Sequence, residues 1–252
     1  MGARKHLPFT EGEYYHIYNR GVDKRTITED WKDSERFLQS IVEFNTVKPI
    51  GSIYENKFSP RVSSVKKDKL GGSTTKYDSK LVEIVAYCLN PNHYHLILTP
   101  LVEKGIEKFM QKLGTGFTQY FNEKYNRSGS LFQGKFKSAH LDYNEYLMHV
   151  AAYVNLNDKV HQLGGRTAKL VRSSWWEYLG ESVTSNGGKK RAKICDKDIV
   201  LGQFKTSKEY EKSAMESLKF TLENRYDDPG LGLDLLAKEE HPEKFEKKNM
   251  LK

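Results

Sequence analysis

The sequence predicts an α+β domain whose elements follow the order strand, helix, strand, strand, helix, strand. Three observations support this prediction. Side chains alternate between two faces in Tyr14–Val22, which is typical of a strand. Apolar residues recur at helical spacing in Val102–Asn126. The chain has 252 residues, of which 37% are hydrophobic, and this is enough to build a buried core.

The first half of this order is a strand followed by a helix. The strand Tyr14–Val22 ends around Gly21, and the helix is expected to begin at a capping residue, Asp33 or Ser34, and to end near Asn45. The next stretch, 48–80, is rich in Gly, Ser, Lys and Thr and has little periodicity. It therefore predicts a long loop inserted into the domain.

The second half begins with a hairpin. Leu81–Leu89 is rich in β-branched and aromatic residues, and Asn90-Pro91-Asn92 supplies turn residues before a strand that starts at His93. The helix Val102–Asn126 and an extended stretch, Leu131–Leu141, complete the order. Together these elements predict a ferredoxin-like βαββαβ sheet, with two helices on one face and the other face free for a ligand or for further elements.

Further elements follow the sheet. A helix capped near Asp142 or Asn144 is expected to extend to Asn157, and a tail helix is expected over about residues 208–224. A Gly-, Ser- and Lys-rich break, 181–190, separates them, and the charged end, 238–252, is expected to fray. We therefore divide the chain into a domain of residues 1–180 and a linker with a small helical extension, 181–252.

Two histidines, His93 and His95, lie one residue apart on the predicted strand. Alternation places both imidazoles on one face and Tyr94 on the other, with Leu96 and Leu98. Such a pair can bind a metal ion, although a chain with eight histidines can also carry a surface pair without a ligand. Tyr153 and Asn157 lie four residues apart, so one helix face can present both. A tyrosine in such a helix can equally be a packing residue.

The overall charge favours a polyanionic partner. Lys and Arg total 41 against 33 Asp and Glu, which gives a net charge of +8, although a merely basic protein would show the same balance. Two cysteines are too few for a disulfide framework and suit a reducing compartment. Because no apolar run of about 18 residues occurs, we expect a cytoplasmic protein without a membrane segment.

Four ordered segments resemble the REP-associated tyrosine transposases, within the wider family of single-tyrosine HUH endonucleases. These segments are Tyr15-His16-Ile17-Tyr18-Asn19-Arg20-Gly21, Asn90-Pro91-Asn92-His93-Tyr94-His95-Leu96-Ile97-Leu98, Gly129-Ser130-Leu131-Phe132-Gln133-Gly134-Lys135-Phe136-Lys137-Ser138 and Tyr153-Val154-Asn155-Leu156-Asn157. The resemblance spans about residues 14–180. It implies that His93, His95 and Asn157 hold a divalent metal and that Tyr153 is the nucleophile.

The sequence departs from the family at one point. The family usually follows its Asn with Pro, whereas Asp158 follows Asn157 here. A proline at that position would help to end the helix, so its absence leaves the placing of Asn157 open. The family implies Mg²⁺ or Mn²⁺, whereas two imidazoles alone would suit Zn²⁺ or Mn²⁺ at least as well.

The resemblance implies a transposase-like endonuclease and strand transferase that acts on single-stranded or hairpin DNA through a 5′-phosphotyrosine. Arg20, Lys135 and Lys137 are the predicted DNA-binding residues, through phosphate contacts beside aromatic rings. Two alternatives stay open: a non-catalytic ferredoxin-like DNA- or RNA-binding protein, and a nuclease that uses water as its nucleophile. The sequence also leaves open whether the protein is a monomer or a homodimer.

Overall fold

The computed structural model describes residues 8–48, 53, 80–181 and 193–223. The main strands are β1 (Tyr14–Arg20), β2 (Val82–Leu89), β3 (His93–Pro100) and β4 (Lys137–Leu141). The main helices are α1 (Trp31–Phe44), α3 (Gly105–Lys124), α4 (Asn144–Asn155) and α9 (Ser207–Glu223). The short elements are a 3-10 turn η1 (Val22–Lys24), α5 (Asn157–Val160), α6 (Gly165–Ala168), β5 (Arg172–Ser173), α7 (Trp175–Tyr178) and α8 (Asp198–Leu201).

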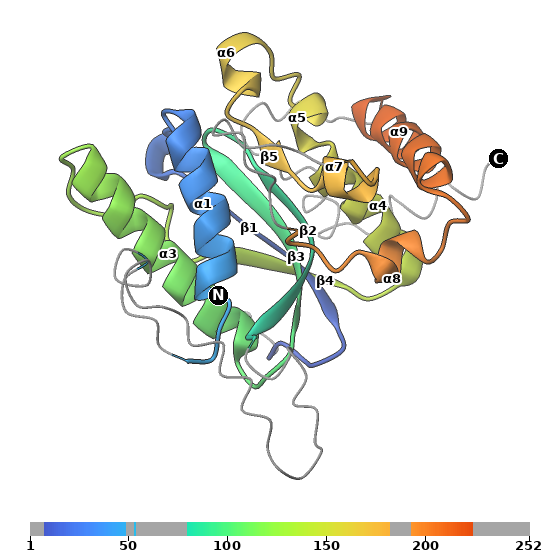
Figure 1. The fold of residues 1–252 in the computed structure, drawn as a ribbon, viewed down its shortest axis with the longest axis horizontal. Coiled ribbons are helices and arrows are strands. Elements are labelled where there is room, and N and C mark those ends of the chain that lie inside the picture. Colours follow the sequence, from blue (N-terminus) through green and yellow to red (C-terminus); the bar gives the residue numbers. More distant parts are fainter. Residues whose placement is uncertain (1–7, 49–52, 54–79, 182–192, 224–252) are drawn as a thin grey trace, which may run out of the picture.

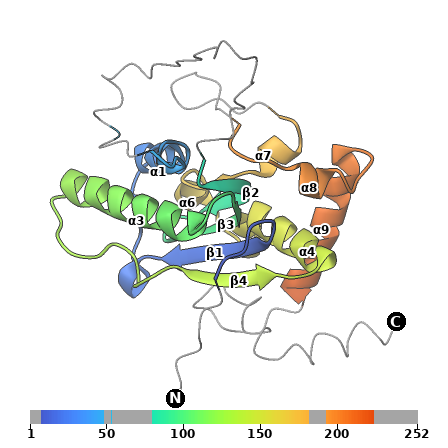
Figure 2. The same ribbon diagram turned by 90° about the horizontal axis from the view of Figure 1, so that it is seen from below.

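The strands form one antiparallel sheet in the order β4-β1-β3-β2-β5. The first four strands have the order of a ferredoxin-like sheet, and β5 adds a two-residue edge next to β2. Figure 2 shows β4 at the opposite edge, beside β1. The predicted α+β class, the ferredoxin-like order and the β2–β3 hairpin are therefore confirmed.

The two faces of the sheet carry separate cores (Figure 1). Helices α1 and α3 cover one face, where Ile17 of β1 and Tyr94 of β3 are buried. Helix α4 covers the other face, with α7, α8 and α9 around it, and Ile97 of β3 is buried there. Successive side chains of each strand therefore point alternately into the two cores. The second face, expected to be free for a ligand or for further elements, is covered over most of its area by such further elements, α4 and the helices around it.

The N-cap of helix α1 lies three residues before Asp33, the earlier of the two capping residues that the sequence suggested. Asp30 is the N-cap and accepts a hydrogen bond from the Asp33 backbone N–H, while the Asp33 carboxylate accepts from the Asp30 N–H, forming a capping box. Asp33 is fully buried and also accepts from Tyr120, Tyr125 and Lys124 of the α3 region. One carboxylate therefore joins the start of α1 to the end of α3.

Two expected elements differ from the structure. Within Leu131–Leu141 only Lys137–Leu141 forms a strand, because Phe132 pairs with Gly21 in an isolated bridge and the chain turns at Gly134, where φ is 68°. The helix expected to reach Asn157 ends at Asn155. Leu156 breaks it with φ −110° and ψ 20°, and Asn157 begins α5.

The described part of the C-terminal extension packs against α4. Tyr210 and Leu218 of α9 are buried in the second core together with Tyr153 and Val154 of α4. The tail helix predicted over about residues 208–224 is confirmed as α9. The domain boundary at residue 180 stays a prediction, and most of the 48–80 insertion, the 181–190 break and the 238–252 end lie outside the described residues. No helix of the described part is long and apolar enough to span a membrane.

Candidate active site

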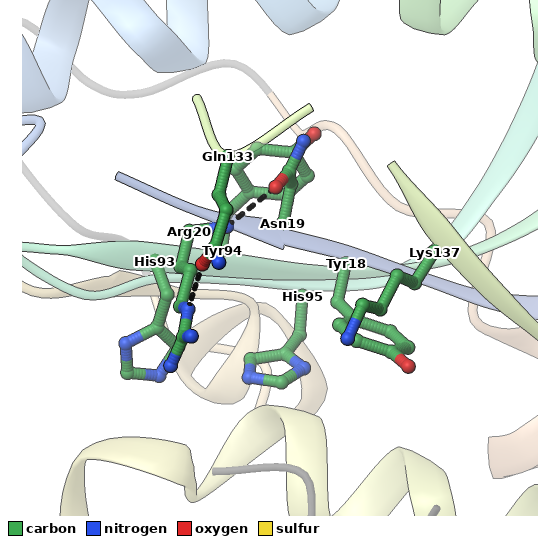
Figure 3. Close-up of a pocket in the computed structure, with 8 residues that line it drawn as sticks. All are labelled: Tyr18, Asn19, Arg20, His93, Tyr94, His95, Gln133 and Lys137. Atoms are coloured by element: carbon green, nitrogen blue, oxygen red, sulfur yellow. Dashed lines mark hydrogen bonds between the residues drawn. The ribbon is translucent and has the colours of Figure 1, made fainter. Parts of the chain in front are cut away.

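Strand β3 directs His93 and His95 toward the face covered by α4, as Figure 3 shows. The Tyr94 side chain lies on the opposite face of the sheet and packs against Phe37 of α1, with ring centroids 5.3 Å apart. The strand is fixed on that side by the core, so the two imidazoles have a rigid base. His95 is 1% exposed, whereas His93 is half-buried at the start of the strand.

Three asparagines surround the His93 ring. Asn92 Oδ1 lies 2.6 Å from Nδ1 and accepts its proton, because an amide oxygen cannot donate. Nε2 of the neutral ring therefore carries a lone pair, and Asn90 Nδ2 donates to it at 2.8 Å. Asn157 Oδ1 lies 3.1 Å from the same Nε2 and 2.5 Å from Asn90 Nδ2. Two acceptors, His93 Nε2 and Asn157 Oδ1, thus converge on one point of the site.

His95 forms a buried pair with a third histidine, His16 of β1. His16 Nε2 lies 2.9 Å from His95 Nδ1, and the two rings are stacked with their centroids 5.0 Å apart. Burial lowers the pKa of His16 to about 3, and burial with nearby histidines lowers the pKa of His95 well below its usual value. Burial and His161 lower the pKa of His93 to about 4. All three rings are therefore neutral at pH 7, the form in which an imidazole binds a metal.

Tyr153 of α4 lies beside the same histidine. Its ring centroid is 5.5 Å from that of His95, with the rings at 87°, and 6.3 Å from that of His16. Tyr153 is only 3% exposed. The predicted nucleophile and the predicted metal ligands are thus neighbours within one chain, although Tyr153 lies below the surface.

A pocket of about 110 Å³ opens beside the two histidines of β3. Its lining residues are Tyr18, Asn19, Arg20, His93, Tyr94, His95, Gln133 and Lys137. The guanidinium of Arg20 donates to Gln133 Oε1, and the Arg20 backbone N–H donates to Asn19 Oδ1 at 2.8 Å (Figure 3). Two cationic side chains therefore flank the imidazoles, an arrangement that suits an anionic ligand such as a phosphate.

The structure brings most of the sequence-predicted site residues together. His93, His95, Tyr153 and Asn157 meet at one place, and Arg20 and Lys137 line the adjoining pocket. Lys135 does not line it: the residue is exposed in the segment before β4.

Several residues of the site had no site role in the sequence analysis, among them His16, Asn90, Gln133 and His161. The His161 ring lies 4.9 Å from that of His93, at 73°. The position of His16 could have been predicted from the sequence. Side chains alternate along β1, and β1 lies next to β3 in a ferredoxin-like sheet, so His16 is expected on the same face as His93 and His95. Asn90 was interpreted as a turn residue, Gln133 lay in one of the family-like segments without an assigned role, and no pattern in the sequence distinguished His161.

The donor set limits how a metal could bind. In the described part of the chain no group of three or more His, Cys, Asp or Glu side chains is arranged to hold a metal ion. A metal would therefore have two imidazoles and the Asn157 amide oxygen as protein donors. Two observations fit such a role: His95 Nε2 is buried with no hydrogen-bond partner, and His93 Nε2 and Asn157 Oδ1 converge although neither carries a proton.

Comparisons with known proteins include a match between part of the chain and one family model. The family model described as "Transposase IS200 like" matches residues 62–157, which include His93, His95, Tyr153 and Asn157. A similar solved structure is titled "Structure of the REP associates tyrosine transposase bound to a REP hairpin"; it is 12% identical, with a TM-score of 0.46, over 78% of this chain and 94% of that chain. No curated protein matches the chain. The family match confirms, over residues 62–157, the resemblance to insertion-sequence transposases that the sequence motifs indicate.

Proposed function

We propose that this protein is a metal-dependent, transposase-like endonuclease and strand transferase that cuts single-stranded or hairpin DNA with Tyr153 as its nucleophile. The observation that carries the proposal is the meeting of Tyr153 with His95, 5.5 Å apart between ring centroids, beside a pocket flanked by Arg20 and Lys137. The match of residues 62–157 to IS200-like transposases supports the same reading.

His93, His95 and Asn157 would hold the metal, with Mg²⁺ or Mn²⁺ as the ions that the family resemblance implies. A bound divalent ion polarises the scissile phosphate and so makes attack by a weak nucleophile easier. Asn90 would position these two side chains before the metal binds, because its amide donates to both His93 Nε2 and Asn157 Oδ1. A metal on His93 Nε2 would take the lone pair that accepts this hydrogen bond and so replace the Asn90 donor.

The chemistry at Tyr153 is a transesterification. The phenol oxygen attacks phosphorus, its proton passes to solvent or a nearby base, and the bond from phosphorus to the 3′-oxygen breaks. The 3′-oxygen leaves as a hydroxyl and the 5′-phosphate stays on the tyrosine. Attack by another 3′-hydroxyl reverses these steps and joins strands without a nucleotide cofactor. Because Tyr153 is 3% exposed, DNA binding must be accompanied by movement of this side chain or of its helix.

Arg20 and Lys137 are the groups that would hold the DNA backbone next to the reacting phosphate. Both line the pocket with the histidines, and the contact with Gln133 orients the Arg20 guanidinium. The exposed Lys135 would contact the backbone outside the pocket.

The test is a denaturing gel with hairpin DNA labelled in separate samples at its 5′ or 3′ end, in the presence of Mn²⁺ or Mg²⁺. We expect the 3′ label to migrate with the protein and the 5′ label to appear on a shorter, free fragment. Removal of the metal with a chelator should abolish both products.

Matched variants identify the residues responsible. Tyr153→Phe and His93→Ala should each lose the protein-linked label, whereas Tyr146→Phe on the same helix and His140→Ala on the exposed part of β4 should keep it. Free cleavage products that persist in Tyr153→Phe would identify water as the nucleophile. Hairpin binding without any cleavage would support a non-catalytic nucleic-acid-binding protein instead.

A further inference from the structure

His16 has no part in the proposed reaction, yet it is one of the buried polar groups of the site. It is 1% exposed and touches the site through its 2.9 Å contact from Nε2 to His95 Nδ1. The Tyr18 ring is stacked with that of His95, with centroids 6.0 Å apart, and tilted against that of His16, with centroids 5.2 Å apart. The Tyr153 ring stands edge-on to His95. The aromatic neighbours therefore hold the two imidazoles in one orientation.

The proton count of this pair allows two arrangements. Each neutral ring has one N–H, and one of the two N–H groups lies in the shared hydrogen bond. The outer nitrogens, His16 Nδ1 and His95 Nε2, are both buried without a hydrogen-bond partner among the described residues. If His95 donates, its Nε2 is bare and His16 Nδ1 carries a proton. If His16 donates, His95 Nε2 is protonated and cannot bind a metal.

We propose that His16 is a positioning residue that accepts the Nδ1 proton of His95 and so keeps His95 in the tautomer whose bare Nε2 can bind the metal. This inference rests on the proposed metal site. A histidine that binds a metal commonly donates its other ring N–H to a neighbouring acceptor, which fixes both tautomer and ring direction. In this chain the acceptor is another imidazole, supplied by the adjacent strand β1.

Two substitutions at His16 separate hydrogen bonding from packing. Gln places its terminal amide near the position of Nε2 and can accept the His95 proton, whereas Phe keeps the ring volume without an acceptor. The control is His140→Phe, because His140 is exposed on β4 and pairs with Glu13 away from the site. Thermal unfolding monitors the fold of each variant.

The first readout is Mn²⁺ affinity without DNA, measured from the electron paramagnetic resonance signal of free Mn²⁺. We expect His16→Phe to weaken binding by about 10- to 100-fold, His16→Gln to stay close to wild type, and His140→Phe to be unchanged. Equal affinity in wild type and His16→Phe, or equal losses in Phe and Gln, would overturn the role of His16 alone. Wild-type protein that binds no Mn²⁺ would instead overturn the metal site itself.

The second readout is independent of metal and of any variant that fails to fold. Nitrogen-15 chemical shifts distinguish protonated from bare ring nitrogens in the metal-free wild-type protein. We expect His95 to carry its proton on Nδ1 and His16 to carry its proton on Nδ1 as well. A proton on His95 Nε2 would contradict the proposal, whatever the affinities show.

Discussion

At the scale of single residues, two acceptors of the site face each other and share one donor group. Asn157 Oδ1 and His93 Nε2 are 3.1 Å apart, and only the Asn90 amide donates to both. Buried acceptors in this arrangement are costly unless a donor or a cation lies between them. In the metal-free site the Asn90 amide is that donor, and a metal ion bound here would replace it.

The place of Asn157 Oδ1 beside His93 Nε2 predicts how Asn157 variants bind metal. Asn157→Ala removes one of three protein donors and should weaken Mn²⁺ binding at least ~10-fold. Asn157→Asp keeps an oxygen at the same position and adds a negative charge, so we expect binding at least as tight as in wild type. Isothermal titration of the metal-free protein with Mn²⁺ measures both. An Asn157→Ala protein that binds Mn²⁺ like wild type would remove Asn157 from the ligand set.

At the scale of elements, helix α4 connects the site to the C-terminal extension. Asn155 lies two residues from Tyr153; its Nδ2 donates to Tyr210 of α9 at 2.6 Å, and its Oδ1 accepts from Ser174 at 2.5 Å. Ser174 Oγ in turn accepts from the Tyr87 N–H of β2 at 2.9 Å. A buried polar chain thus runs from α9 through α4 to the sheet, and it fixes the helix that carries the proposed nucleophile.

Tyr210→Phe tests this connection. The change keeps the buried ring but leaves Asn155 Nδ2 without its acceptor, and we expect the free energy of unfolding to fall by about 1–3 kcal/mol. Urea denaturation measures the loss. Tyr143→Phe is the control, because Tyr143 is 49% exposed and should change stability little. No loss in Tyr210→Phe would show that the hydrogen bond does not stabilise the fold.

At the scale of the whole molecule, the proposed site is complete within one chain, since Tyr153 lies beside the histidine of its own β3. A mixture of Tyr153→Phe and His93→Ala proteins should therefore form no covalent DNA adduct. A homodimer that exchanged its tyrosine helices would restore activity in the mixture. A denaturing gel after prolonged mixing distinguishes the two, with light scattering to determine the oligomeric state.

The raised pKa of one carboxyl group outside the site predicts how the stability of the protein depends on pH. Burial, with the hydrogen bond and charge of Asp196, raises the pKa of Glu83 in β2 to about 7. Between its usual value of 4.5 and pH 7 the folded protein binds more protons at Glu83 than the unfolded chain does, so stability falls as pH rises through this window. Glu83→Gln should therefore raise the melting temperature more at pH 8 than at pH 5. Equal changes at both pH values would contradict this assignment.

The sequence predicted the fold well wherever a local pattern decided the structure. The alternation in β1 and β3 and the apolar spacing in α3 are local, and so is the turn at Asn90-Pro91-Asn92. The contact between His16 and His95 needed the pairing of β1 with β3, and the break at Leu156 needed the packing around α4 and α5. The path of Leu131–Phe136 was set by the bridge from Phe132 to Gly21, which no local pattern encodes.

The pairing of distant segments has a consequence for folding. His16 and His95 are separated by 79 residues, and Asn90 and Asn157 by 67. Contacts this far apart in the chain form only after long loops have closed, so such pairs are made late and cooperatively. During synthesis the histidine face stays incomplete until the segment after β4 has left the ribosome. A nascent or partly unfolded chain therefore carries the reactive groups without assembling them, and any cutting activity would begin only when folding is finished.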